Sequence, residues 1–283
     1  MRVSLPPHLV EHAREFADRR RTPSEPRDAA TVILMRRGTG GPDLYLLRRQ
    51  TSMGFAGGMC VFPGGGVDPR DFDGSVAWSG PAPSVWADQL QTSEEMARAL
   101  VCAAVRETFE ESGVLLAGAS ASDVVADTSG EEWEADRRAL EAKDLSFTAF
   151  LDSRGLVLRT DLLGAWSAWC TPEFEPRRFR TWFFVAALPP GQLTRDVSTE
   201  SSSVTWMSAL GACDAVDAEE LAMMPPTYVT CLEVGQYADP DAVLGAAPDR
   251  DLTMFTPAVE GEGETATMSI PEHSVPLLEA RRG

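Results

Sequence analysis

The segment RETFEESGV, residues 106–114, places three carboxylates at helical spacing. Glu110 and Glu111 follow Glu107 by three and four residues, so a helix would present all three on one face. Like charges at these spacings destabilise a helix by roughly 0.2–0.5 kcal/mol per pair. The repulsion indicates that a positive group lies between the three glutamates.

A run of glycines precedes this segment in the chain. GMCVFPGGG, residues 58–66, is a short apolar run that predicts a strand ending in three glycines. Glycine allows backbone carbonyls to approach a cation closely, and hard divalent ions take oxygen ligands. The acidic helix and the glycine turn together predict a cradle for Mg²⁺.

The elements that must position these groups follow from apolar alternation and turn residues. Predicted strands lie at 28–37, 44–49, 58–66, 162–172, 179–188 and 204–208. Predicted helices are an N-terminal one ending near Arg21, one over 92–112, one or two within 130–153, and one over 218–235 that is broken at Pro225-Pro226.

Two local features surround the acidic helix. Thr92 and Glu95 have the spacing of a capping box, which predicts that the helix begins at Thr92. Residues 67–91 are rich in Pro, Gly, Asp and Ser but contain Trp78 and Trp86. Large aromatic surfaces are unfavourable in water, so we expect this segment to be a loop docked on the core.

Composition limits the function. The chain has 283 residues and 43% hydrophobic content, enough for a substantial core. Its formal charge of −18 opposes binding of nucleic acid or anionic membranes. Five scattered cysteines without C-x-x-C spacing favour neither disulfides nor a zinc site, and no long apolar run or signal segment is present. We therefore expect a cytoplasmic protein.

These features resemble the Nudix hydrolases, whose box reads G-x5-E-x7-R-E-U-x-E-E-x-G-U, where U is a bulky apolar residue. The second half of the box matches from Arg106 to Val114, and only Thr108 departs, where an aliphatic residue is usual. With Gly65 as the box glycine, about 27 extra residues lie before Arg106. Counting back from Arg106 then places Arg98 where the box has its first glutamate.

A box with an insertion is similar to the coenzyme A diphosphatase branch, related to the type-19 Nudix enzymes. Four downstream segments are similar, in the same order, to segments of that branch: WCTP from Trp169, RRFRTWFF from Arg177, VTW ending at Trp206, and MPPT from Met224. The resemblance covers most of residues 28–235.

The resemblance implies roles for the residues of the box. Glu107, Glu110 and Glu111 would bind one to three Mg²⁺ or Mn²⁺ ions, with the carbonyl of Gly65 as a further ligand. Arg106 would hold a carboxylate through a charge-assisted bond rather than touch substrate. The general base would be Glu107, on family grounds, or a residue on a downstream loop.

Substrate-binding candidates lie on the strands after the box. Alternate residues of a strand share a face, so Arg178 and Arg180 point the same way and one of them is a candidate for binding phosphate. Trp169 is a candidate for stacking on a base or lining a pantetheine channel. The structural alternatives, an ordinary ion pair for each arginine and core packing for the tryptophan, stand beside these roles.

The resemblance implies an α/β fold, the Nudix α/β/α sandwich. Its mixed sheet would lie between the 92–112 helix and a helix from the 211–235 region, with an inserted loop and extra C-terminal helices. The expected organisation is an N-terminal helical extension over 1–27, a Nudix domain over 28–235 with the 67–91 insertion, and a C-terminal extension over 236–283.

The implied activity is metal-dependent hydrolysis of a diphosphate linkage, with coenzyme A or acyl-coenzyme A as the leading substrate. ADP-ribose or NADH is the alternative, so the partner in each case is a small nucleoside diphosphate derivative. A third hypothesis is a catalytically inactive Nudix binding module, which Arg98 favours and the three glutamates oppose. The sequence leaves the oligomeric state open, a homodimer included.

Overall fold

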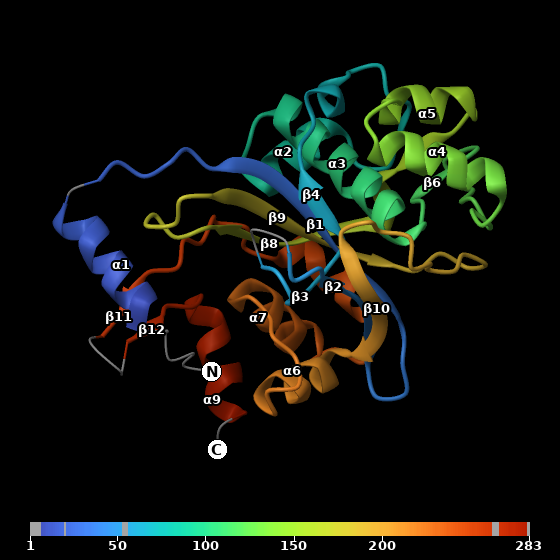
Figure 1. The fold of residues 1–283 in the computed structure, drawn as a ribbon. Coiled ribbons are helices and arrows are strands. Elements are labelled where there is room, and N and C mark those ends of the chain that lie inside the picture. Colours follow the sequence, from blue (N-terminus) through green and yellow to red (C-terminus); the bar gives the residue numbers. More distant parts are fainter. Residues whose placement is uncertain (1–6, 20, 53–55, 262–265, 282–283) are drawn as a thin grey trace.

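A mixed sheet forms the centre of the computed structural model, which describes residues 7–19, 21–52, 56–261 and 266–281 (Figure 1). Its strand order is β10 (Ser201–Ser208), β2 (Pro42–Arg49), β1 (Arg27–Arg37), β9 (Phe179–Ala187) and β8 (Leu163–Cys170). β1 runs parallel to β9. The other neighbouring strands pair antiparallel: β2 with β1, β2 with β10, and β8 with β9. Two short strands extend it: β3 (Cys60–Val61) beside β2, and β4 (Gly64–Gly66) beside β1.

The central strand β1 is buried on both faces, which explains its continuous run of apolar residues. Val32 and Leu34 point into one hydrophobic core, and Ile33 and Met35 point into the other. The period of two residues that separates these pairs is the pleat of the strand. One sheet therefore carries two cores, each of which needs a covering layer.

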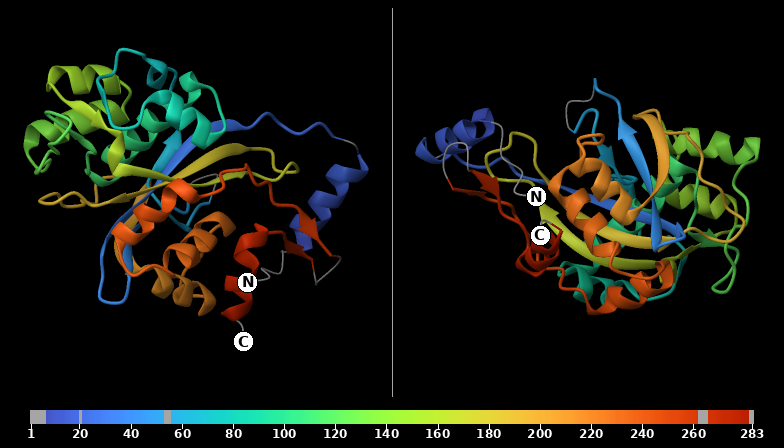
Figure 2. Two further views of the ribbon diagram at one scale, coloured as in Figure 1. Left: turned by 180° about the vertical axis from the view of Figure 1, so that it is seen from behind. Right: turned by 90° about the horizontal axis from the view of Figure 1, so that it is seen from below.

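Helices cover both faces of the sheet, as the two further views show (Figure 2). One layer contains α2 (Pro83–Leu90), α3 (Glu94–Ser112), α4 (Glu131–Glu141) and α5 (Phe147–Ser153). A small sheet of β5 (Trp78–Ser79), β7 (Val157–Arg159) and β6 (Ala117–Gly118) belongs to this side. The other layer contains α6 (Ala209–Asp217), α7 (Pro225–Val234), α8 (Pro240–Ala246) and α9 (Val275–Ala280). The expected α/β/α sandwich with extra C-terminal helices is confirmed.

The acidic helix is α3, and its two ends are set by local sequence. Ser93 is the N-cap, because its side chain accepts a hydrogen bond from the backbone of Met96 at 3.2 Å. The predicted start at Thr92 was wrong by one residue, since a threonine directly before a serine leaves the choice of cap to tertiary packing. Gly113 ends α3 at φ 74°, the left-handed conformation that glycine adopts without strain.

The inserted segment is more ordered than the predicted loop. It contains a 3₁₀ turn over Pro69–Phe72, strand β5 and helix α2. Trp86 on α2 is only 2% exposed and packs against Phe184 of β9 with ring centroids 5.9 Å apart. The indole of Trp182 donates to the carbonyl of Leu90 at 3.1 Å, which ties the end of α2 to the sheet. Docking on the core is confirmed, but the segment is folded rather than a loop.

The helical region before residue 235 also differs from its prediction. Instead of one broken helix over 218–235, α6 ends at Asp217 and α7 begins at Pro225. Pro225 and Pro226 occupy the first turn of α7, where their missing amide hydrogens cost nothing. The prolines therefore start a helix rather than interrupt one.

The two ends of the chain meet outside the main sheet. Helix α1 (Pro7–Asp18) lies beside the antiparallel pair β11 (Val259–Glu260) and β12 (Thr267–Met268) (Figures 1 and 2). Val10 and Ala266 form a small cluster of buried side chains at this contact. No helix within the described ranges is long and apolar enough to cross a membrane.

Candidate active site

The carboxylates of α3 gather around one arginine. The guanidinium of Arg106 donates to Glu107 Oε1 at 2.7 Å and to Glu110 Oε1 at 3.2 Å. Its Nη2 also donates to the carbonyl of Gly66 at 3.0 Å. Arg106 is only 8% exposed, so these bonds form away from water. Arg106 thus contacts two of the three glutamates directly.

A fourth carboxylate, Asp71, completes the surroundings of Arg106. Its Oδ1 accepts from Arg106 Nε at 3.0 Å, and its Oδ2 accepts from Nη2 at 2.9 Å, a two-point ion pair. Asp71 is 3% exposed and also accepts from the backbone of Asp68 at 2.8 Å, which closes the 3₁₀ turn. The start of the inserted segment is thereby fastened to the acidic helix.

Asp71 corrects the assignment of Arg98 to the first acidic position of the box. Asp71 lies six residues after Gly65, which is the spacing of the box glutamate when it is counted forward from the glycine. The extra residues therefore lie between Asp71 and Arg106, and counting back from Arg106 crossed them. Arg98 instead lies over the ring of Trp78, 5.4 Å from its centroid. Counting in both directions would have found Asp71.

The glycine strand β4 lies directly against the glutamates. The backbone amide of Gly64 donates to Glu111 Oε2 at 2.7 Å. A Cβ added at Gly65 would lie 2.4 Å from Glu107 Oε1, so a side chain at this position would collide with the carboxylate. Gly65 and Glu107 are thus in close approach, and this explains the need for glycine at the end of this strand.

Burial and mutual repulsion disturb the protonation of all three glutamates. Burial raises the pKa of Glu110 to about 7, and the charge of Glu107 adds to the rise. Burial likewise raises the pKa of Glu111 well above its usual value, with Glu107 and Glu200 adding to the rise and Gly64 and Arg49 opposing it. Burial also raises the pKa of Glu107, against the opposing charge of Arg106. The positive charge near the cluster is therefore too small to neutralise its carboxylates.

This donor set fits a hard divalent cation by its chemistry. Three carboxylates on one helix face, beside a glycine strand, supply the oxygen ligands that Mg²⁺ and Mn²⁺ prefer. Among the described residues, no group of three or more such side chains is already arranged as a metal cage. The reason is visible in the contacts, because Arg106 engages Glu107 and Glu110 while Gly64 engages Glu111.

The structure gives the predicted phosphate-binding arginines other partners. Arg180 forms a two-point ion pair with Asp28, at 2.7 and 3.2 Å, across the parallel pair β1–β9. Arg178 donates to the carbonyls of Thr171 and Ser24. Neither arginine contacts the glutamates of α3 in these bonds, so their role in substrate binding stays a prediction.

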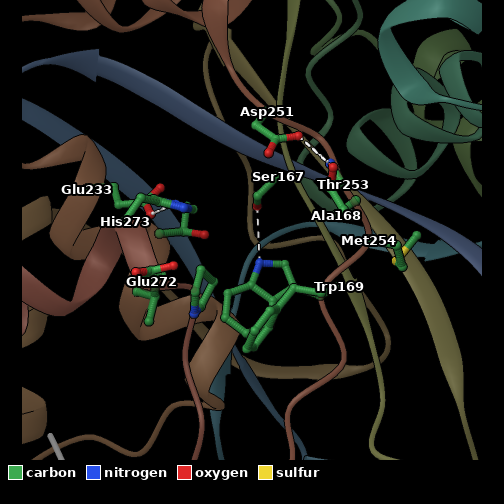
Figure 3. Close-up of a pocket in the computed structure, with 13 residues that line it drawn as sticks. Ser167, Ala168, Trp169, Glu233, Asp251, Thr253, Met254, Glu272 and His273 are labelled. Carbon is green, nitrogen blue, oxygen red and sulfur yellow. Dashed lines mark hydrogen bonds and ion pairs between the residues drawn. The ribbon is translucent and has the colours of Figure 1, made fainter.

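Trp169 lies on the other face of the sheet from the acidic helix. It is 4% exposed, belongs to the core under α7, and meets Phe255 edge to face at 5.1 Å. Beside it is a cavity of about 520 Å³ that the C-terminal residues help to line (Figure 3). The structure therefore does not bring Trp169 together with the glutamates.

The chemistry of this cavity does not suit a diphosphate. Its lining includes Glu233, Asp251 and Glu272, and no arginine or lysine among the described lining residues. Glu233 is fully engaged, because it accepts from His273, Ser274, Trp166 and Arg250. The glutamates of α3, rather than this cavity, remain the candidate active site.

The fold has a counterpart among known structures. A mixed sheet between two helical layers, with a glycine strand against a helix of three glutamates, is the architecture of the Nudix hydrolases. A crystal structure of a Nudix hydrolase from Alicyclobacillus acidocaldarius superimposes with a TM-score of 0.68. The match covers 78% of this chain and 96% of that one, at 24% identity.

The family follows from the sequence itself. The profile of the NUDT19 Nudix domain matches residues 82–233, which is more than half of the chain and includes α3 and its glutamates. The chain therefore belongs to the Nudix superfamily, in the family of the NUDT19 Nudix domain.

Relatives of this chain carry related names. A putative nudix hydrolase 7 from Caenorhabditis elegans is 26% identical over 220 residues, which cover 76% of this chain and 62% of the relative. An acyl-coenzyme A diphosphatase NUDT19 from Xenopus laevis is 26% identical over 228 residues, covering 67% of this chain and 59% of the relative. The chain thus spans about three fifths of the length of these two relatives.

Proposed function

We propose that this chain is a metal-dependent hydrolase that cleaves the diphosphate linkage of coenzyme A or acyl-coenzyme A. The observation that carries the proposal is the set of buried Glu110 and Glu111 and partly buried Glu107, held between Arg106 and the glycine strand β4. A solvated acidic helix face would need none of these contacts. The choice of substrate rests on the name of the Xenopus laevis relative, an acyl-coenzyme A diphosphatase.

The residues of the cluster would have two different roles, metal binding and positioning of the metal ligands. Glu107, Glu110 and Glu111 would hold the divalent ions, with the carbonyl of Gly65 as a further ligand. Such ions neutralise charge on the phosphate oxygens while water attacks phosphorus. Asp71 and Arg106 position the glutamates, because their ion pair fixes the guanidinium to which Glu107 and Glu110 are bonded. They would act through the carboxylates without touching substrate.

Water would add to one phosphorus atom while the bond from that phosphorus to the bridging oxygen breaks, so each product would keep one phosphate of the diphosphate linkage. From coenzyme A these products are 3′,5′-ADP and 4′-phosphopantetheine. The proton of the water must pass to a base. Glu107 is the leading candidate for it, and a carboxylate on a loop after the box is the alternative.

The hypothesis of an inactive binding module loses its main support. Arg98 in place of an acidic residue was the sequence feature that favoured it. Asp71 occupies that position and forms the ion pair with Arg106. With all acidic positions of the box filled, an intact catalytic site is the better hypothesis.

A substrate panel tests the proposal. Purified protein would be incubated with coenzyme A, acetyl-coenzyme A, ADP-ribose, NADH and dinucleoside polyphosphates, with Mg²⁺, with Mn²⁺ or with excess EDTA, and products would be identified by mass spectrometry. We expect cleavage that requires a divalent ion and favours the coenzyme A compounds. A tenfold higher kcat/KM for ADP-ribose or NADH would favour the alternative substrate class.

A further inference from the structure

A second arginine, Arg49, faces the acidic helix from the end of β2. Tyr45 and Leu47 of β2 point into the core under α3, and the pleat of the strand puts Arg49 on the same face. Its Nη2 donates to Glu200 Oε2 at 2.9 Å. Arg49 therefore lies on the side of the sheet that α3 covers, and its ion pair brings Glu200 to the same side.

The two partners of this pair differ in their surroundings. The side chain of Arg49 is 19% exposed, whereas that of Glu200 is 53% exposed. The Nε atom of Arg49 is buried and has no hydrogen-bond partner within the described part of the chain. Glu200 can therefore move into water at little cost in free energy. The side chain of Arg49 remains mostly buried, and its Nε–H still needs a hydrogen-bond acceptor.

A network of hydrogen bonds fixes the loop that carries Glu200. Arg137 donates to the carbonyl of Glu110 at 2.7 Å and to Glu141 at 3.1 Å. Glu141 in turn accepts from the hydroxyl of Thr199 at 2.6 Å. The amide side chain of Gln50 donates to the carbonyl of Thr199 at 2.7 Å. The acidic helix, α4, β2 and the loop are thus connected around the Arg49–Glu200 pair.

The charges around the cluster leave few cations for an incoming phosphate. Arg106 is occupied by three carboxylates and one carbonyl, and Arg180 is held by Asp28. Among the described residues, the side chain of Arg49 bonds only to Glu200, a carboxylate that is half exposed. An ion pair with a half-exposed carboxylate is weak because water competes for the carboxylate, whereas guanidinium–phosphate contacts are often two-pronged and stronger. A phosphate can therefore displace Glu200 from Arg49.

We propose that Arg49 binds the diphosphate group of the substrate and that Glu200 is its counter-ion while the site is empty. On binding, a phosphate oxygen takes the place of Glu200 on the guanidinium. The inference rests on the proposed function, which it extends by naming the cation that recognises the diphosphate. In this proposal, Arg49 increases the affinity for substrate, and Glu200 takes no part in the chemical step.

Variants of three residues test this assignment. Arg49→Gln removes the cation, Arg49→Lys keeps the charge without the planar fork, and Glu200→Gln removes the counter-ion. Arg48→Gln is the matched control, because Arg48 is the neighbouring arginine of the same strand and donates to the carbonyl of Gly58. Each variant would be titrated with ADP by calorimetry in the presence of Mg²⁺, so that the proposed metal ligands do not repel the phosphates, and the measurement of binding requires no turnover.

The expected results separate affinity from chemistry. Arg49→Gln should weaken ADP binding about tenfold or more, the size of one lost charge-assisted contact, and Arg49→Lys should restore part of it. Glu200→Gln should bind ADP as tightly as the wild type or up to about fivefold more tightly. Arg48→Gln should match the wild type. For the diphosphate that is cleaved best, Arg49→Gln should raise KM with little change in kcat.

Several results would overturn the inference. ADP binding by Arg49→Gln equal to that of Arg48→Gln would remove Arg49 from the site, as would a wild type that fails to bind ADP at millimolar concentration. A hundredfold loss of kcat in Glu200→Gln would make Glu200 part of the chemistry instead of a counter-ion. If no diphosphate is cleaved but ADP binds through Arg49, the binding assignment stands and the proposed reaction fails.

Discussion

The ion pair between Asp71 and Arg106 gives the most specific test of the site's construction. Asp71→Asn keeps the size of the side chain but removes its charge. The amide offers one acceptor where the carboxylate accepts from Nε, from Nη2 and from the backbone of Asp68. The variant therefore leaves buried donors without partners and turns an NH₂ group toward the guanidinium.

The size of the effect follows from burial. Removing one partner of a buried ion pair costs about 3–5 kcal/mol, because the other charge is left without compensation. Arg106 keeps Glu107 and Glu110 as partners, so we expect the lower end, roughly 3 kcal/mol. The freed guanidinium should also shift toward these two glutamates, and kcat should fall by about tenfold or more, on the scale of disturbed electrostatic preorganisation.

Urea unfolding in EDTA at pH 7.5 measures the stability change as a shift of the midpoint at constant slope. Asp241→Asn is the matched control, because Asp241 pairs with Arg37 on the surface, where both side chains are more than half exposed. The control should lose no more than about 1 kcal/mol. Equal losses in Asp71→Asn and the control would refute the role of Asp71.

Two further predictions concern the glutamates and the glycine strand. Since burial raises the pKa of Glu110 to about 7, the native state keeps a proton there that the unfolded chain releases above its ordinary pKa of 4.5. In EDTA, the free energy of unfolding should therefore fall as the pH rises from 4.5 to 7, and this group should account for roughly 3 kcal/mol of the fall. Urea titrations at a series of pH values should show a smaller fall for Glu110→Gln than for the wild type. A steeper fall in the variant would contradict this prediction. A Cβ at Gly64 would meet the backbone oxygen of Ala30 at 2.5 Å, whereas the three atoms nearest to a Cβ at Gly65 all belong to the carboxylate of Glu107. Gly64→Ala should thus lower the melting temperature, and Gly65→Ala should keep it while losing activity; the reverse pattern would show that Glu107 does not lie against Gly65.

Much of the architecture could be read from the sequence because it is encoded locally. Alternation and turn glycines located the strands of the main sheet, and the spacing of Glu107, Glu110 and Glu111 identified one face of a helix. The inserted segment hid Asp71 from a count that started at Arg106, because the extra residues lie between Asp71 and Arg106, and only a count that starts at Gly65 reaches Asp71. The ion pair of Asp71 with Arg106 joins residues 35 apart in sequence.

Partners of the arginines could not be read from the sequence for the same reason. Arg180 meets Asp28 because the parallel pairing of β1 and β9 places them side by side, although 152 residues separate them. Arg49 and Glu200 are 151 residues apart and meet through the antiparallel pair of β2 and β10. A strand pattern shows which residues share a face, but it leaves open which charges the neighbouring strand supplies.

The central claim is that the three glutamates of α3 support metal-dependent hydrolysis of a diphosphate. The most direct measurement is the rate of product formation from coenzyme A by the wild type and by Glu111→Gln, with Mn²⁺ and with excess EDTA. Glutamine at this position retains an oxygen that can accept the bond from Gly64. The account predicts 3′,5′-ADP and 4′-phosphopantetheine from the wild type with Mn²⁺, none in EDTA, and at least about a hundredfold lower kcat in the folded variant. Full activity in EDTA, or an undiminished rate in Glu111→Gln, would contradict it.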